Sequence, residues 1–132
     1  MENNIINDLL NSLYKYRAKI VRVVDADTMD ITVDLGFGVT ITQRFRINDY
    51  DAPETWRPRN EAEKVHGEQA TSRAKELLVD KPIIIESSKV PGVYGRYSAT
   101  IWLEDGRNFS EVMISEGFQK KEVYEDVNTI VS

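Results

Sequence analysis

The chain contains no cysteine, which excludes a disulfide scaffold and a zinc site built from thiolates. It has a single histidine, His66, so a metal site made of several imidazoles is also excluded. A bound metal would have to be held by oxygen atoms, which favours Ca²⁺ or Mg²⁺. His66 lies within a predicted helix, two residues after Lys64, and we expect it to be an exposed or half-buried spectator.

Long apolar runs are absent as well. No stretch is long enough to span a membrane, so we expect no membrane partner. The first residues lack the basic and apolar regions of a signal peptide. We therefore expect a cytoplasmic protein if Met1 is the natural start, and the alternative is a secreted form that has been trimmed.

The balance of charges is negative. The chain has 22 acidic and 17 basic residues, which gives a formal net charge of −5. This charge argues against a protein that grips nucleic acid tightly and without regard to sequence, although it leaves room for a local positive cleft. The length of 132 residues, with 41% hydrophobic and 30% charged residues, is typical of one soluble domain with a single core.

Three consecutive strands are predicted in the first third of the chain. Residues 16–24 are rich in Val, Ile and Tyr, and residues 29–35 alternate strictly between apolar and polar side chains. The glycines of "GFG" at 36–38 predict a turn, after which residues 39–47 alternate again. These segments predict an antiparallel meander.

Helices are predicted on both sides of this meander. Residues 3–13 have the apolar spacing of a short amphipathic helix, which would cover one end of the core or meet a partner. A second helix is expected after Asn60, a plausible N-cap with Glu63 at the capping-box position, and Pro82 closes it. Its predicted inner stripe comprises Ala62, Val65, Gln69, Ala70, Ala74, Leu77 and Leu78.

The remaining elements complete a predicted α+β fold. Two further strands are expected around "IIIESSK" and "GRYSATIW", followed by a helix in "FSEVMISEG" that ends at Gly117. Five strands with a helix inserted after the third, a C-terminal helix and a short N-terminal helix predict a small closed β-barrel of the OB type. We divide the chain into an N-terminal extension (1–15), the main domain (16–124) and a tail (125–132).

Charged and polar residues gather in three short motifs: "VVDADT" at 23–28, "FRINDYDAPET" at 45–55 and "YGR" at 94–96. Each motif alone has an ordinary explanation, because Asp is common in turns. Together they are harder to dismiss. Carboxylates from separate loops suit a hard cation, and the two arginines, Arg46 and Arg96, suit a phosphate. Glu54 is then left to orient or deprotonate water, which completes the ingredients of phosphodiester hydrolysis.

These motifs, in this order, closely resemble those of the staphylococcal nuclease (thermonuclease) family. The similarity extends from about Tyr16 to Tyr124 and includes "HGEQAT" and "SEGF". The resemblance implies that Asp27 and Asp51 are direct Ca²⁺ ligands, assisted by the backbone carbonyl of Ala52. It also implies that Asp25 acts on the metal through a bound water.

The resemblance assigns roles to the remaining residues. It implies that Glu54 is the general base and that Arg46 and Arg96 stabilise a five-coordinate transition state. Tyr94 matches a tyrosine near the nucleotide, whereas the tail position that stacks on a base falls on Val123, which leaves Tyr124 as the substrate-binding candidate. The implied reaction cleaves the P–O5′ bond of exposed or single-stranded DNA and RNA and leaves 3′-phosphates.

Two alternatives to a nuclease stay open. One is a non-catalytic module of the same shape that binds nucleic acid or protein, and the other is a structural Ca²⁺ protein. The carboxylate–arginine set argues against the first, and the two arginines argue against the second.

The familiar secreted members of the family are basic, whereas this chain is acidic. We therefore expect capture of substrate to depend on local charges, supplied by Arg44, Arg57, Arg59 and Lys64. Trp56 is expected to be a loop aromatic near the cleft, and Trp102 a core residue of the last strand.

Overall fold

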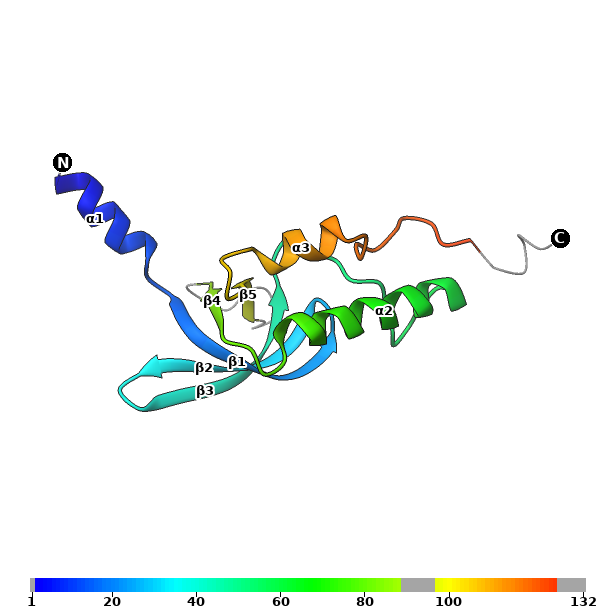
Figure 1. The fold of residues 1–132 in the computed structure, drawn as a ribbon, viewed down its shortest axis with the longest axis horizontal. Coiled ribbons are helices and arrows are strands. Elements are labelled where there is room, and N and C mark those ends of the chain that lie inside the picture. The colour runs from blue at the N-terminus through cyan, green and yellow to red at the C-terminus, as the bar shows by residue number, and fades with distance from the viewer. Residues whose placement is uncertain (1, 89–96, 126–132) are drawn as a thin grey trace.

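The computed structural model describes residues 2–88 and 97–125. Figure 1 shows a twisted barrel of strands with two helices packed along one side and a third helix at the N-terminal end. In chain order, the elements are α1 (Glu2–Asn11), β1 (Lys15–Asp25), β2 (Thr28–Gly36), β3 (Val39–Ile47), α2 (Glu61–Leu78), β4 (Ile83–Ser87), β5 (Tyr97–Trp102) and α3 (Phe109–Ser115).

The five strands close into a barrel in the order β1-β2-β3-β5-β4. The ring closes because β1 pairs with β2 along its second half and with β4 along its first residues. The β3–β5 pair is parallel and the other pairs are antiparallel, so the sheet is mixed. The predicted α+β fold is confirmed, including the helix inserted after the third strand.

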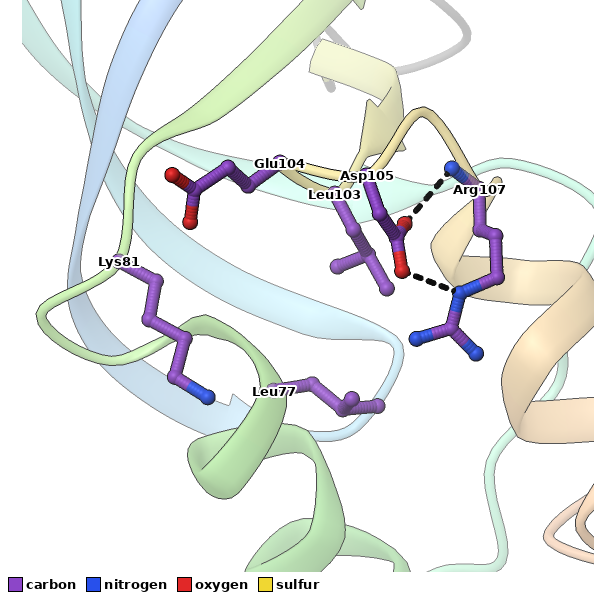
Figure 2. A pocket seen from close by; sticks show the side chains of 6 residues that line it. All are labelled: Leu77, Lys81, Leu103, Glu104, Asp105 and Arg107. Carbon is purple, nitrogen blue, oxygen red and sulfur yellow. Dashed lines mark hydrogen bonds and ion pairs between the residues drawn. The ribbon is translucent and has the colours of Figure 1, made fainter.

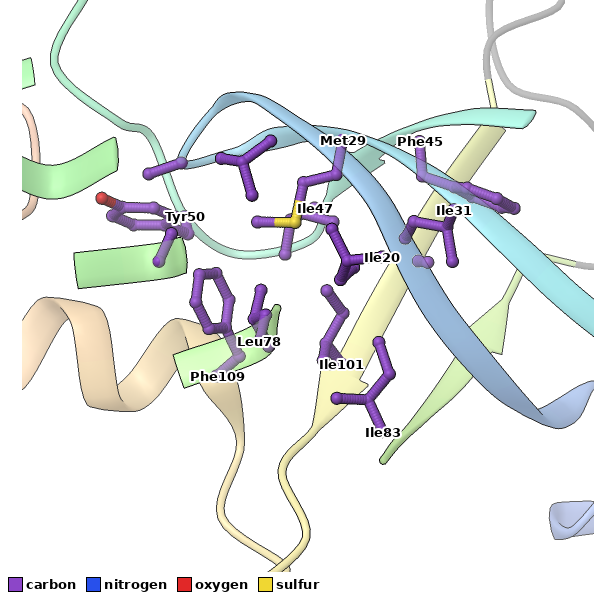
Figure 3. Packing of buried hydrophobic residues seen from close by; sticks show 14 of the residues in the cluster. Ile20, Met29, Ile31, Phe45, Ile47, Tyr50, Leu78, Ile83, Ile101 and Phe109 are labelled. Atoms are coloured by element: carbon purple, nitrogen blue, oxygen red, sulfur yellow. The ribbon is translucent and has the colours of Figure 1, made fainter. Parts of the chain in front are cut away.

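The barrel interior is filled by the apolar residues that alternate along the strands (Figure 3). Met29 and Ile31 of β2 are fully buried, as is Ile101 of β5. Helices α2 and α3 add side chains from one side of the barrel. Their buried apolar residues are Ala70, Ala74, Leu78, Phe109, Val112 and Met113.

Two apolar surfaces remain outside this core. The β2–β3 hairpin projects beyond the barrel, and Phe37 at its tip is fully exposed. The apolar residues of α1 are also exposed, and the helix points away from the barrel in Figure 1. Of the two alternatives expected for this helix, it therefore does not cover the core. Within residues 2–88 and 97–125, the helices are too short or too polar to cross a membrane.

Helix α2 begins at the predicted cap and buries Ala70, Ala74 and Leu78 of the predicted inner stripe. The side chain of Asn60 accepts a hydrogen bond from Glu63 N, as an N-cap should. The Glu63 carboxylate reaches the backbone N–H of Arg59 rather than that of Asn60, and it is fully buried. The predicted inner positions of Val65 and Gln69 are exposed instead. The buried residues of the helix are Glu63, Gly67, Ala70, Ala74 and Leu78.

Gly67 lets the segment after β3 lie directly against α2. A Cβ atom at this position would be 2.8 Å from Pro53 O and 3.0 Å from Glu54 O. It would also be 2.9 Å from Thr55 Cγ2. The missing side chain therefore sets how closely this segment approaches the helix.

We predict that Gly67→Ala lowers the free energy of unfolding by about 1–3 kcal/mol, because the new methyl group must displace backbone atoms. Alanine has the higher helix propensity by about 1 kcal/mol, so a net loss would isolate the packing effect. Urea unfolding measures the change. Ser72→Ala, on the exposed side of the same helix, is the control and should be neutral or slightly stabilising. An equally stable Gly67→Ala variant would contradict this account.

Candidate functional site

The guanidinium of Arg46 lies between two carboxylates that are distant in sequence. Its Nη2 contacts Asp51 Oδ1 and lies 3.5 Å from Asp27 Oδ2. The Asp27 side chain is only 15% exposed, whereas that of Asp51 is 68% exposed. Two negative charges of different burial therefore converge on one positive charge.

The strand register brings these groups together. Asp27 lies in the turn between β1 and β2, and Thr28 directly after it pairs with Arg46 of β3. Ile47 N also donates a hydrogen bond to Asp27 O over 2.8 Å. Because Arg46 lies near the end of β3, its neighbours along the chain are the first residues of the loop that carries Asp51.

Backbone carbonyls hold the Arg46 side chain in place. Its Nη1 donates to Ile47 O over 2.8 Å and to Tyr50 O over 2.6 Å. A third carbonyl, that of Asp27, lies 3.5 Å away. These contacts use one side of the guanidinium fork and leave Nη2 directed at the carboxylates.

The predicted carboxylates also contact the loop after β3. Asp27 Oδ2 accepts a hydrogen bond from Ala52 N over 2.9 Å, and its Oδ1 accepts one from Thr28 Oγ1 over 3.0 Å. Asp25 Oδ1 accepts a hydrogen bond from Thr55 Oγ1. The structure therefore brings Asp27, Arg46, Asp51 and Ala52 into one cluster. Asp25 contacts the same loop through Thr55.

Tyr50 fixes the start of this loop in the core. Its ring is 3% exposed and packs edge-on against Phe109 of α3, as Figure 3 shows. Its hydroxyl donates to Phe118 O over 2.7 Å. Burial raises the pKa of the Tyr50 phenol, and the nearby charge of Asp27 raises it further, so the hydroxyl remains a donor. Asp49 just before it has φ +63°, a conformation that Asp tolerates in a turn.

The segment after α3 supports the loop from the other side. Lys120 N donates to Asp51 O over 2.8 Å, and the side-chain oxygen of Gln119 accepts from Asp51 N over 3.4 Å. Gln119 and Lys120 belong to none of the sequence motifs. A motif could not predict the backbone hydrogen bond of Lys120, because almost every residue type has the same N–H group.

Glu54 and Glu63 are linked by one ammonium group. The Nζ of Lys120 lies 4.0 Å from Glu54 Oε1 and 3.8 Å from Glu63 Oε2. Glu54 is 44% exposed, so its carboxylate can meet water. Burial by itself would raise the pKa of Glu63, but hydrogen bonds from the backbone and side chain of Arg59 and the charge of Lys120 hold it below its usual value.

Tyr124 binds α2 rather than the carboxylates. Its hydroxyl lies 2.7 Å from His66 Nδ1, and its ring lies under the guanidinium of Arg59. His66 Nε2 lies 2.8 Å from Gly117 O, so this histidine joins two parts of the C-terminal segment. His66 was expected to be a spectator, and this role was not predicted. It depends on contacts with residues more than 50 positions away in sequence.

Two of the four expected cleft cations have partners within the protein. Arg44 pairs with Asp30 over 2.8 Å across β2 and β3, and this hydrogen bond lowers the pKa of the Asp30 carboxyl. Arg59 pairs with the buried Glu63 and donates to the carbonyls of Lys121 and Glu122. Both cations therefore have carboxylate partners, although Arg44 itself remains 58% exposed.

A shallow pocket elsewhere on the surface is lined by none of the predicted site residues (Figure 2). Leu77 and Lys81 form one wall of it, and the turn after β5 forms the other. Asp105 in this turn accepts hydrogen bonds from the backbone and side chain of Arg107. These charges satisfy one another, so the pocket offers no comparable cluster.

The donor set of the cluster suits a hard cation. Asp27 and Asp51 supply oxygen atoms only, and both already face a positive charge. Within the described ranges, no group of three or more His, Cys, Asp or Glu side chains gathers around one point. Ca²⁺ also accepts backbone carbonyls and water as ligands, so two carboxylates fit it when such oxygens complete the shell. Tyr94 and Arg96 lie outside the described residues.

Comparisons with known proteins agree with the barrel fold. A family described as staphylococcal nuclease homologue matches residues 44–130, and the chain belongs to this family. Protein ParB of Escherichia coli is 27% identical over 109 residues, which cover 76% of this chain and 54% of ParB. The chain spans about half the length of this curated relative. Membership indicates a nuclease-like or nucleic-acid-binding function.

We predict that Glu63→Gln lowers the free energy of unfolding at neutral pH by about 1–3 kcal/mol, because the amide cannot match the charged hydrogen bonds of Arg59. The pKa of Glu63 is lower in the folded state than its ordinary value of 4.5. Its stabilising effect is therefore present above pH 4.5 and is lost as the pH falls through the folded-state pKa.

Urea unfolding of the parent and the variant between pH 7 and pH 3 tests this. The difference between them should shrink toward acid pH. Glu68→Gln, at an exposed position of the same helix, should change stability by less than about 0.5 kcal/mol throughout. A Glu63→Gln difference that stays constant with pH would show that the charge of Glu63 is not what stabilises the fold.

Proposed function

We propose that this protein is a Ca²⁺-dependent nuclease that hydrolyses phosphodiester bonds of exposed or single-stranded DNA and RNA. The observation that carries the proposal is the convergence of Asp27 and Asp51, from two separate turns, on the guanidinium of Arg46. A purely structural cluster of this kind would need no access to solvent, because its charges would already neutralise one another as an ion pair. Here Asp51 is open to solvent and Arg46 is 40% exposed, so both are accessible to a phosphate and a cation.

In the proposed site, Asp27, Asp51 and the carbonyl of Ala52 would hold the metal, and Asp25 would act on it through water. When bound, Ca²⁺ supplies positive charge that offsets the two carboxylates and polarises a phosphoryl oxygen. Arg46 would bind the phosphate through Nη2. Its Nη1, anchored on the carbonyls of Ile47 and Tyr50, keeps the guanidinium oriented, which reduces the reorganisation needed in the transition state.

Glu54 is the proposed base. Its carboxylate orients a water molecule and accepts its proton while the water oxygen bonds to phosphorus and the P–O5′ bond breaks. The departing 5′ oxygen takes a proton from solvent water, so the products are a 3′-phosphate and a free 5′-hydroxyl. Arg46 and Arg96 stabilise the additional negative charge of the five-coordinate transition state. The ammonium of Lys120 lies 4.0 Å from Glu54 Oε1, on the same side of the site as the proposed base.

The direct test is digestion of plasmid and single-stranded DNA with added Ca²⁺ and with excess chelator. We expect cleavage only with Ca²⁺, and 3′-phosphate ends on the products. Glu54→Gln and Arg96→Ala should each reduce kcat by about 10²–10³-fold, since each removes a group that acts in the transition state.

Glu104→Gln is the matched control, because Glu104 lines the separate pocket of Figure 2 and should not affect cleavage. Calcium binding should be measured independently by calorimetry with Asp27→Asn and Asp51→Asn. Cleavage that is equal with and without chelator would overturn the metal-dependent mechanism. Nucleic-acid binding without any cleavage would instead favour the binding module.

A further inference from the structure

Trp56 is a large aromatic residue on the surface next to the candidate site. It is 76% exposed and lies in the segment between β3 and α2, two residues after Glu54. Trp102, by contrast, is half-buried in β5. Single exposed apolar side chains are common on protein surfaces. Trp56 differs from most of them because a cation is stacked on its ring and the candidate base is two residues away.

We propose that Trp56, with Arg57 stacked on it, is a platform for an unpaired nucleobase of single-stranded DNA or RNA. The base belongs to a nucleotide that flanks the phosphate held by Arg46, and in this respect the inference rests on the proposed nuclease function. Bases stack on aromatic side chains with little regard to sequence, because every base has a π-face.

The contact between Trp56 and Arg57 favours a nucleic acid over a purely apolar partner. The guanidinium carbon of Arg57 lies 4.2 Å from the centroid of the indole ring. It covers one face of the ring, and the large exposed area leaves the other face accessible. A base on the open face would thus be next to a cation that attracts the neighbouring phosphates.

The platform is held between two anchored points. On one side, Thr55 donates a hydrogen bond to Asp25 and packs where Gly67 has no side chain. On the other side, Arg59 is tied to Glu63 of α2 and to carbonyls of the C-terminal segment. Only three residues separate these anchors, so little conformational freedom remains to be lost when a base binds.

The position of the platform predicts a preference for single strands. Two residues of extended chain span at most about 7 Å, so a base on Trp56 must be close to Glu54 along the nucleic acid. In a duplex the bases are already stacked and paired, and moving one onto Trp56 would cost that stacking. A single strand has no such cost. The platform therefore favours an unpaired base beside the scissile phosphate.

Fluorescence titration with oligo(dT) in excess chelator tests the platform without cleavage. In a Trp102→Phe background, Trp56 is the only tryptophan, and we expect its emission to be quenched on binding. Anisotropy of fluorescein-labelled oligo(dT) gives the Kd without the Trp102 change. Trp56→Ala should weaken Kd by about 5- to 150-fold, and Trp56→Phe by much less.

Phe37→Ala is the matched control, because it removes an exposed aromatic at the far tip of the β2–β3 hairpin, about 26 Å along the strands from Arg46. It should leave Kd unchanged. An abasic oligonucleotide should bind the parent and Trp56→Ala equally, which separates base stacking from charge.

The platform would be wrong if Trp56→Ala left the Kd for oligo(dT) unchanged and if oligo(dT) did not change the emission of Trp56. The exposed Trp56 would then be a contact for a protein partner. If Trp56→Ala still cleaves DNA in that case, the nuclease proposal stands without the platform. Quenching of Trp56 by oligo(dT) in a protein that never cleaves DNA would support the platform and refute the proposed catalysis.

Discussion

The candidate site depends on one interaction, the contact of the Arg46 guanidinium with Asp27 and Asp51. Two carboxylates at such close range repel each other unless a positive charge lies between them. Arg46 supplies that charge, and the carbonyls of Ile47 and Tyr50 prevent its side chain from turning away. The pairing of Thr28 with Arg46 in turn fixes the distance between the two turns. The barrel therefore positions the site through its strand register.

The C-terminal segment is the second support of the site. Tyr50 and Asp51 of the loop are bound by backbone groups of Phe118 and Lys120, so the loop is held from both sides. The same segment is fastened to α2 through His66 and Arg59. A buried carboxylate, Glu63, balances the cations at this junction. Ion pairs and hydrogen bonds thus join the loop, the helix and the C-terminal segment.

Much of this arrangement was predictable from local patterns. The alternation of apolar residues in 29–35 and 39–47 predicts two strands with one buried face, and the structure has β2 and β3 there. Asn60 marks the start of α2 because its side chain caps the helix. The face of α2 was harder to predict, because Glu63 was expected at the cap and proves to be buried. In a sequence pattern, a charged residue such as Glu63 predicts an exposed position. Glu63 can be buried because Arg59 and Lys120 balance its charge.

The sequence alone determined the barrel, the order of its elements and the residue types of the cluster, because these follow from local alternation, turn residues and motifs. Only the tertiary structure decided which charges are balanced internally. Arg44 and Arg59 seemed available to a ligand but are paired with Asp30 and Glu63, and Tyr124 is bound to His66. The reason is physical: a side chain's charge is set by its own chemistry, but its partner is set by which distant segments the fold brings within hydrogen-bonding distance.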